Sequence, residues 1–288
     1  VAAVEVNGSS VDITISETGQ IVAGTFKMNK GETTVTVKPG WTWFVIDYAT
    51  VELDEEALKP VVPSSSLVTP KASAAANELY NFLLDNWGKK TISGFMTGDM
   101  SSVTTSSGIK DHPDFKAPFE RGGKYTALAG FDFMNATGKT ANSNDSWYLN
   151  YTNISVALAK DLWKNGGIPA FTWHWRSPLY EVDEFYVKSN DHTNGTEIDF
   201  TDAMNSDLTW NTSSALYKNM ISDIDKIADY FLELQNEGVA CIFRPLHEAS
   251  GGWFWWGTQG GAAYAQLYRL IFDEMVKVKG VNNLIWVW

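Results

Sequence analysis

The amino-acid sequence predicts an α/β fold in which a parallel sheet of about five strands follows a smaller, partial β-sandwich. Two observations predict it. The first 54 or so residues are short runs rich in Val, Ile and Thr, separated by turn residues, as in antiparallel β structure. After about residue 71 the apolar residues recur every three or four positions, and helical segments alternate with apolar runs.

Residues 1–54 are predicted to form strands near 11–15, 21–28 and 33–37, with an earlier turn at Asn7-Gly8. A further apolar and aromatic run follows Pro39-Gly40. Such a series of short strands is typical of a β-sandwich. Residues 55–71 hold three prolines and three consecutive serines, which predict a semi-stiff linker.

Residues 72–288 form the second predicted domain. Apolar residues at helical spacing predict helices around residues 76–87, 154–162, 216–231 and 264–275, and strands are expected at 91–96, 125–134, 168–174, 239–246 and 283–288. By itself this alternation fits either a doubly wound sheet or an incomplete barrel. No Gly-x-Gly-x-x-Gly or P-loop motif is present, so a nucleotide-binding fold has no support.

The composition excludes several classes of partner. The net charge of −12 disfavours nucleic acid and anionic membrane surfaces, whereas a neutral polymer would be indifferent to it. No apolar stretch is long enough to span a bilayer, so no membrane insertion is expected. The chain begins in a strand-like run without an initiator Met, and we interpret it as a window from a longer protein.

Glu248 is the candidate acid/base residue. The apolar run 239–243 predicts a strand buried on both faces, and Pro245 interrupts its pairing, so His247 and Glu248 should lie at its carboxyl end. In βα barrels that end carries the active site. A carboxyl group buried among the tryptophans that follow would keep its proton near neutral pH, as a general acid requires. The alternative is a structural carboxylate.

His247-Glu248 does not begin a metalloprotease signature, because no second His follows one helical turn later. We therefore predict no metal and no cofactor.

Tryptophan is over-represented, with 13 residues, and much of the excess follows two predicted strands. Five such indoles are hard to bury together, since each N–H then needs a partner. Flat sugar faces suit exposed indoles. His174, between Trp173 and Trp175, is a candidate for bonding sugar hydroxyls. Asp132 also follows a strand end, where a loop-capping role is at least as plausible.

Six motifs in this order resemble glycoside hydrolase family 26, over roughly residues 72–288: Ile92-Ser93-Gly94, Gly130-Phe131-Asp132, Trp173-His174-Trp175, Arg244-Pro245-Leu246-His247-Glu248, Gly252-Trp253-Phe254-Trp255-Trp256-Gly257 and Leu284-Ile285-Trp286-Val287-Trp288. The family consists mostly of secreted endo-β-1,4-mannanases. The resemblance implies a (β/α)8 TIM barrel, of which about five strands are present here, and a retaining mechanism. It implies the acid/base role for Glu248 and substrate contacts for His174, His247, Trp253, Trp175 and Trp256.

The family's nucleophilic glutamate lies on the seventh strand, and no residue of this chain matches it. We therefore expect these 288 residues alone to be inactive, because a retaining reaction needs two carboxyl groups. The expected substrate is mannan, galactomannan or glucomannan. The alternatives are another β-glycan, such as mixed-linkage glucan or xylan, and a non-catalytic carbohydrate-binding protein.

Residues 1–54 resemble the later part of a family 35 carbohydrate-binding module, through Val4-Glu5-Val6-Asn7-Gly8 and the run from Gly40 to Tyr48. Trp41 and Trp43 are the candidate sugar-stacking residues of this module. Strand alternation puts both on one face, so burial of that face in the core is the equal alternative.

Overall fold

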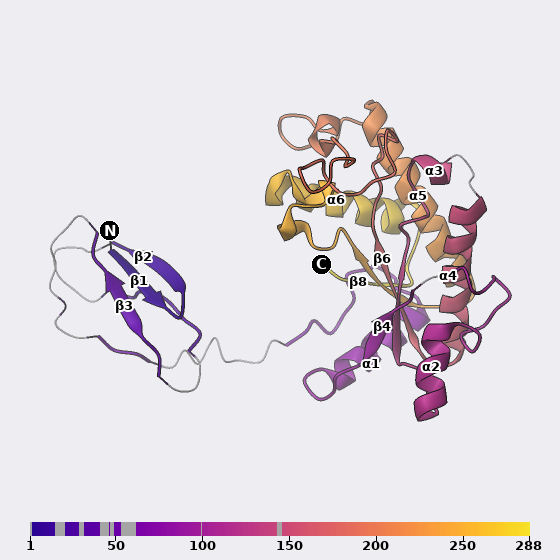
Figure 1. Cartoon of the computed structure of the whole chain (residues 1–288), viewed down its shortest axis with the longest axis horizontal. Helices are drawn as coiled ribbons and strands as arrows, with labels where there is room; N and C mark the ends of the chain where they lie inside the picture. The colour runs from indigo at the N-terminus through magenta and orange to yellow at the C-terminus, as the bar shows by residue number, and fades with distance from the viewer. Residues whose placement is uncertain are drawn as a thin grey trace. The chain divides into compact units, whose positions relative to one another are not determined.

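The computed structural model describes residues 2–14, 21–28, 32–40, 46, 49–52, 62–98, 100–142 and 146–288 (Figure 1). The chain divides into two compact units, Val1–Pro63 and Ser64–Trp288. Trp41 and Trp43, the predicted stacking residues of the first unit, lie outside the described residues.

The described part of the first unit holds an antiparallel sheet in the order β2-β1-β3, formed by β1 (Ala2–Val6), β2 (Ser9–Ile13) and β3 (Val35–Lys38). Asn7 and Gly8 both have positive φ, at 50° and 84°, as a tight hairpin turn requires. The side chains of β1 alternate between buried and half-buried. The predicted strand at 21–28 is wrong: these residues are described and have no strand pairing.

The second unit contains a five-stranded parallel sheet in the order β4-β5-β6-β7-β8. Its strands are β4 (Gly94–Met96), β5 (Leu128–Asp132), β6 (Ile168–Trp173), β7 (Cys241–Pro245) and β8 (Leu284–Trp286). Each strand pairs in parallel with the next one in the sequence. A doubly wound sheet would reverse this order at a switch point. The sheet is therefore an incomplete (β/α)8 barrel.

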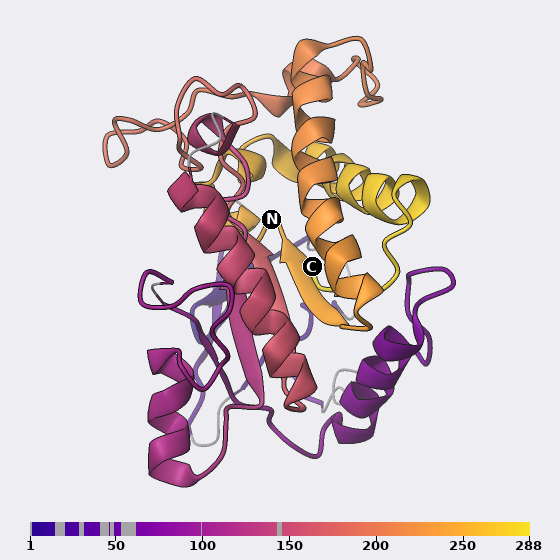
Figure 2. The same cartoon turned by 90° about the vertical axis from the view of Figure 1, so that its right-hand side faces the viewer.

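Helix α4 packs against β5 and β6, and α1 packs against β8. The α-helices described in this unit are α1 (Ala74–Asn86), α2 (Pro113–Gly122), α3 (Lys139–Asn142), α4 (Ser146–Lys164), α5 (Ala215–Asn236) and α6 (Gly260–Phe272). Figure 2 shows α4 and α5 side by side over one face of the sheet. A π-helical turn, η4 (Asp273–Val278), continues α6, and the short 3₁₀ helices are η1 (Phe200–Ala203), η2 (Ala249–Gly251) and η3 (Trp255–Gly257).

Local signals place the helix ends. The Ser73 hydroxyl accepts a hydrogen bond from the Ala76 N–H at 3.1 Å and caps α1. Gly166, with φ of 77°, ends α4 where the sequence predicts a stop. Helix α2 was not predicted from the sequence, because Pro118 breaks its apolar pattern and the helix buries only Phe115.

The core is strongly aromatic. Phe131, Phe171 and Phe243, from β5, β6 and β7, are all at most 1% exposed. Their strands are largely buried along their length, as expected for parallel strands covered on both faces. Among the described residues, no helix is both long and apolar enough to cross a lipid bilayer.

Candidate active site

The candidate site lies at the carboxyl ends of β5, β6 and β7. Asp132 is the last residue of β5, His174 follows β6, and His247 and Glu248 follow β7. The strand register aligns these ends, since Asp132 is level with Thr172 and Trp173 is level with Pro245. This end of the strands is where (β/α)8 barrels carry their chemistry.

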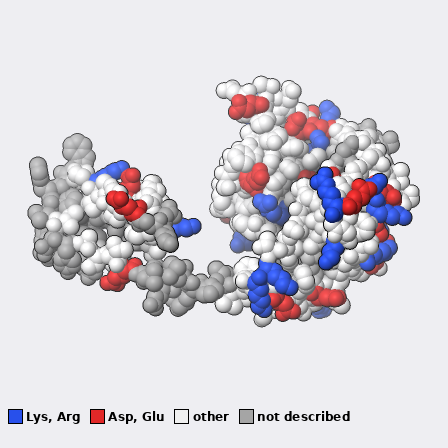
Figure 3. Space-filling view, turned by 60° about the horizontal axis from the view of Figure 1, so that its bottom comes forward, with Lys and Arg blue, Asp and Glu red and all other residues white. Residues whose placement is uncertain are grey.

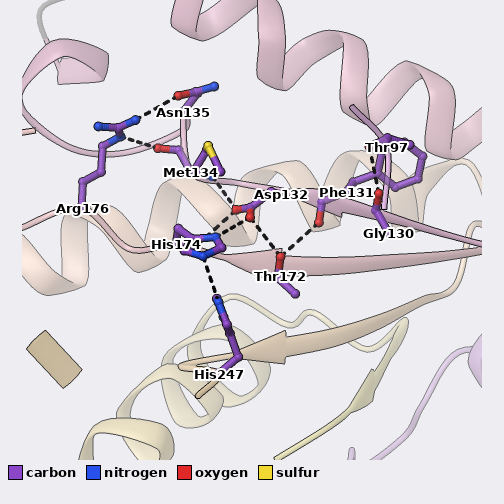
Figure 4. A network of polar contacts seen from close by, with 10 residues as sticks. All are labelled: Thr97, Gly130, Phe131, Asp132, Met134, Asn135, Thr172, His174, Arg176 and His247. Atoms are coloured by element: carbon purple, nitrogen blue, oxygen red, sulfur yellow. Dashed lines mark hydrogen bonds and ion pairs between the residues drawn. The ribbon is translucent and has the colours of Figure 1, made fainter. Parts of the chain in front are cut away.

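Asp132 organises a polar network around His174 (Figure 4). One carboxylate oxygen of Asp132 accepts hydrogen bonds from the backbone N–H groups of Met134, at 2.8 Å, and His174, at 3.2 Å. The other oxygen accepts from the Thr172 hydroxyl at 3.1 Å and lies 2.5 Å from His174 Nδ1. Because an ionised carboxylate can only accept, Nδ1 of His174 carries a proton and its Nε2 faces away from Asp132.

His174 Nε2 lies 3.1 Å from His247 Nε2. Burial, and then the nearby charge of His174, lower the pKa of His247 to about 4, so this ring is neutral at pH 7. Its Nδ1 is buried and has no hydrogen-bond partner among the described residues. The result is a line Asp132–His174–His247 across three adjacent strands.

Arg176 joins the loops around this network. Its Nε donates to the Met134 carbonyl at 2.7 Å, its Nη1 donates to the Asp183 carbonyl, and its guanidinium carbon lies 5.4 Å from the centre of the Tyr148 ring. The segments that follow β5 and β6 are therefore tied together beside His174.

Glu248 lines a hollow of about 510 Å³ at the surface. One wall is formed by Glu248, Gly251, Gly252 and Trp253, and the other by Tyr186, Val187, Ser189, Asp191 and His192. The two walls are joined by backbone hydrogen bonds, from the Val187 N–H to the Trp253 carbonyl at 2.8 Å and from the Trp255 N–H to the Phe185 carbonyl at 3.2 Å. The hollow therefore lies between two loops that are held together by backbone hydrogen bonds.

The backbone turns sharply at Glu248. Leu246 and Glu248 have φ of 52° and 57°, in the left-handed region that costs energy for residues other than glycine. This turn sends the Glu248 side chain to the surface, where it is exposed. The structure thus differs from the expectation that the surrounding tryptophans bury this carboxyl group.

Trp253 is the indole that shares the hollow with Glu248. It is 44% exposed, and its ring lies against Gly251, where an added Cβ would come within 2.2 Å of the ring. A side chain at position 251 would displace the indole. Gly251 therefore allows the Trp253 ring to lie against the loop.

Trp175 and Trp256 are fully buried, which corrects the expectation that they contact substrate. The Trp175 N–H donates to the Asp223 carboxylate at 2.8 Å, and the Trp256 N–H donates to the His247 carbonyl at 2.9 Å. The Trp255 N–H donates to the Trp175 carbonyl at 2.7 Å, and the Trp173 N–H to the Thr137 hydroxyl at 3.2 Å. Four of the five clustered indoles are core residues, because each N–H finds a partner.

Asp132 makes the loop-capping bond that the sequence suggested, to the Met134 N–H, and it also contacts His174; Phe185 and Phe254 were not identified from the sequence. The ring centres of Phe185 and Phe254 lie 4.8 and 5.4 Å from that of His174, so they enclose it. A strand-end position was the available signal for Asp132. The 185–192 segment has no motif that would mark it from sequence.

The charged side chains on the surface of this unit are of mixed sign. Figure 3 shows Lys and Arg interspersed with Asp and Glu over its visible face, without a continuous patch of one sign. In the part of the chain that the structure describes, no group of three or more His, Cys, Asp or Glu side chains could hold a metal ion.

Comparison with known proteins adds a family. The sequence model of glycosyl hydrolase family 26 matches residues 68–288. Mannan endo-1,4-beta-mannosidase of Thermothelomyces thermophilus is 32% identical over 271 residues, which cover 93% of this chain and 51% of that protein. Mannan endo-1,4-beta-mannosidase A of a Piromyces species is 32% identical over 98% of this chain and 44% of its own length. The chain spans about half the length of these curated relatives.

Solved structures agree with the fold. A beta-mannanase from a symbiotic protist of the termite Reticulitermes speratus, in complex with gluco-manno-oligosaccharide, superposes with a TM-score of 0.68 at 40% identity, over 79% of this chain and 65% of that one. The Podospora anserina GH26-CBM35 beta-(1,4)-mannanase gives a TM-score of 0.63 at 27% identity, over 100% of this chain and 60% of that one.

Proposed function

Because the chain belongs to glycosyl hydrolase family 26, we propose that the protein is an endo-β-1,4-mannanase with Glu248 as its acid/base residue. One observation carries the proposal most directly. Glu248 follows the carboxyl end of β7, directly after the Asp132–His174–His247 line, and shares a hollow with the exposed Trp253. Relatives named as mannan endo-1,4-beta-mannosidases support mannan as the substrate.

The proposed reaction is a retaining double displacement. A nucleophilic carboxylate attacks the anomeric carbon of a mannosyl unit while the Glu248 carboxyl group gives its proton to the departing glycosidic oxygen. The Glu248 carboxylate then takes a proton from water, and the water oxygen displaces the enzyme carboxylate from the sugar. The two carboxyl groups of such a site lie about 5–5.5 Å apart.

The nucleophile comes from outside the sheet described here. The resemblance places it on the seventh strand of the barrel, and this sheet has five strands. We expect these 288 residues alone to leave soluble mannan intact. Turnover by them at the rate of the mannanase relatives would contradict this.

The substrate contacts follow from exposure. Trp253 is 44% exposed and lines the same hollow as Glu248, so a sugar ring could stack on its indole. His174 and His247 are also proposed as contacts, on the resemblance. Their Nε2 atoms face each other at 3.1 Å, so a sugar hydroxyl that bonds either one would have to replace this contact. Trp175 and Trp256 are not proposed as contacts, because the core covers both rings.

The test is a panel of mannan, glucomannan, lichenan and xylan with the full-length protein and its Glu248→Gln variant. We expect the wild type to cleave mannan and glucomannan internally, and the variant to lose about 10²- to 10⁴-fold in rate while still binding. Preferred cleavage of lichenan or xylan would replace mannan as the substrate. Binding without cleavage of any glycan would favour a non-catalytic carbohydrate-binding protein.

We also propose that residues 1–54 belong to a carbohydrate-binding module and that the protein is secreted to reach polymeric mannan. The match of the Podospora anserina GH26-CBM35 enzyme over the whole of this chain supports the module. Substituting Trp41 and Trp43 together by Ala should weaken retention of the protein in a mannan-containing native gel. Unchanged retention would remove these residues from the proposal.

A further inference from the structure

Asp223 is the most buried acidic side chain that the structure describes. It lies on α5 and is 0% exposed. Among the described residues, only Asp132 and Asp223 are buried acidic side chains, and they contact consecutive residues of one segment. Asp132 holds His174, and Asp223 holds Trp175. Two buried carboxylates therefore hold the segment that follows β6 by hydrogen bonds.

Asp223 accepts two hydrogen bonds. Its Oδ2 accepts from the Trp175 indole N–H at 2.8 Å, and its Oδ1 accepts from the Tyr180 hydroxyl at 2.9 Å. One helical turn earlier, the Asn219 side chain donates to the Pro178 carbonyl at 2.8 Å. Tyr180 has φ of 60°, so the turn it occupies needs such outside support.

A chain of hydrogen bonds continues from Trp175 toward Glu248. The Trp175 carbonyl accepts from the indole N–H of Trp255 at 2.7 Å, and the indole N–H of Trp256 donates to the His247 carbonyl at 2.9 Å. Trp255 lies edge-on to both Trp175, at 5.1 Å between ring centres, and Trp256, at 5.6 Å. Asp223 is thus linked through packed indoles to the backbone next to His174, at Trp175, and to the backbone of His247.

The carboxylate of Asp223 does not contribute favourably to the stability of the fold. Burial raises the pKa of Asp223 to about 6, and the hydrogen bonds from Trp175 and Tyr180 and the charge of Lys226 only partly offset this. Both hydrogen bonds come from neutral donors. Burying the charge of Asp223 therefore costs more folding free energy than burying an apolar side chain of similar size would. Groups kept in such unfavourable surroundings concentrate near functional sites.

We propose that Asp223 is a positioning residue for the active site: from the side away from the hollow it fixes Trp175 and Tyr180, and so sets His174 and the Glu248 loop. The inference rests on the proposed function for its kinetic consequence only. It does not place Asp223 in contact with substrate.

The test compares Asp223→Ala and Asp223→Asn with Asp161→Ala. Asp161, on α4, is the control. Its carboxylate accepts from the Ile109 N–H at 2.7 Å and, among the described residues, makes no hydrogen bond to the segment after β6. Assayed on mannan in the full-length protein, well below each melting temperature, Asp223→Ala should lose about 10- to 100-fold in kcat/KM, the cost of a misplacement near 1 Å. Asp223→Asn should recover most of it, because an amide can accept from Trp175 and donate to Tyr180.

A second readout does not depend on catalysis. The chain has four histidines, so the ring nitrogens of His174 and His247 can be followed by NMR against His112 and His192. Asp223→Ala should shift the signals of His174 and His247, and Asp161→Ala should not. If Asp223→Ala does not fold, Tyr180→Phe, which removes one of the two bonds, should give the same shifts at smaller amplitude.

The outcomes separate the two proposals. Unchanged signals of His174 and His247 together with unchanged kcat/KM in Asp223→Ala would overturn the positioning role. An equal loss of kcat/KM in Asp161→Ala would also overturn it, since any destabilised variant would then behave alike. A wild type that cleaves no glycan would remove the proposed function, and the NMR comparison would still decide the role of Asp223.

Discussion

The two tryptophan-rich segments after β6 and β7 use their indoles differently. At the end of β6, Trp173 and Trp175 stack at 4.2 Å between ring centres, and both are fully buried. After β7, Trp255 and Trp256 are buried in the same way, but Trp253 is 44% exposed beside Glu248. The first segment therefore supports the site, and the second supplies both the support and the open surface.

The difference lies in where each indole N–H goes. The four buried rings donate to protein acceptors: two side chains, Thr137 and Asp223, and two backbone carbonyls, of Trp175 and His247. A buried indole without such an acceptor would be costly. Richness in tryptophan near a predicted active site is thus no measure of how many rings can bind sugar.

The largest effect on this comparison should come from Trp256→Ala. Removing a fully buried indole leaves a cavity and should cost about 3–5 kcal/mol of unfolding free energy. Urea denaturation measures it. Trp253→Ala is the matched control from the same loop and should cost less than about 1 kcal/mol, because its ring is half-exposed. Equal losses in the two variants would show that the exposure of Trp253 does not reflect its packing.

The next effect concerns Asp223→Asn and pH. The folded-state pKa of Asp223, about 6, lies above the value of about 3.9 expected in the unfolded chain. The protonated carboxyl group of Asp223 therefore stabilises the folded state fully below pH 4, and this contribution to the unfolding free energy is lost as the pH rises through 6. Relative to the wild type, the variant should gain up to about 3 kcal/mol between pH 4 and pH 7.

Chemical denaturation of both proteins at the two pH values measures this gain. Using the difference between the proteins cancels the other titrating groups. A difference that is the same at pH 4 and pH 7 would mean that Asp223 is not in a desolvated state.

A smaller effect should come from Trp253→Ala on substrate binding. Loss of one aromatic face is worth about 0.5–1.5 kcal/mol, which corresponds to roughly 2- to 13-fold weaker binding of mannooligosaccharide. Calorimetry on the Glu248→Gln background avoids cleavage during the titration. Trp87→Ala is the control, since Trp87 is 56% exposed at the end of α1 and is not among the residues that line the hollow. Equal weakening by both variants would count against Trp253 as a contact.

Much of the fold was predictable from sequence. The change of apolar period after the Pro- and Ser-rich segment gave the strand and helix alternation, and every predicted strand after it overlaps an observed one. The strand at 21–28 was wrongly predicted, because Val and Ile favour strands only where a partner pairs with them.

The site was predictable in position but not in detail. His174, His247 and Glu248 follow neighbouring strands, as their sequence context indicated. The burial of most of the clustered indoles was not predictable, since their hydrogen-bond partners lie far away along the chain: Asp223 is 48 residues from Trp175, and the Trp175 carbonyl is 80 residues from Trp255. The exposure of Glu248 follows from a left-handed backbone turn that no residue type in the motif announces.

The most direct test of Glu248 is the dependence of its Gln variant on the leaving group. An acid that protonates the departing oxygen matters for a sugar leaving group and hardly at all for a dinitrophenolate, which leaves without a proton. We predict that Glu248→Gln in the full-length protein loses about 10²- to 10⁴-fold on mannan while cleaving the first bond of a dinitrophenyl β-mannobioside at close to the wild-type rate. Equal losses on both substrates, or no loss on mannan, would contradict the assignment.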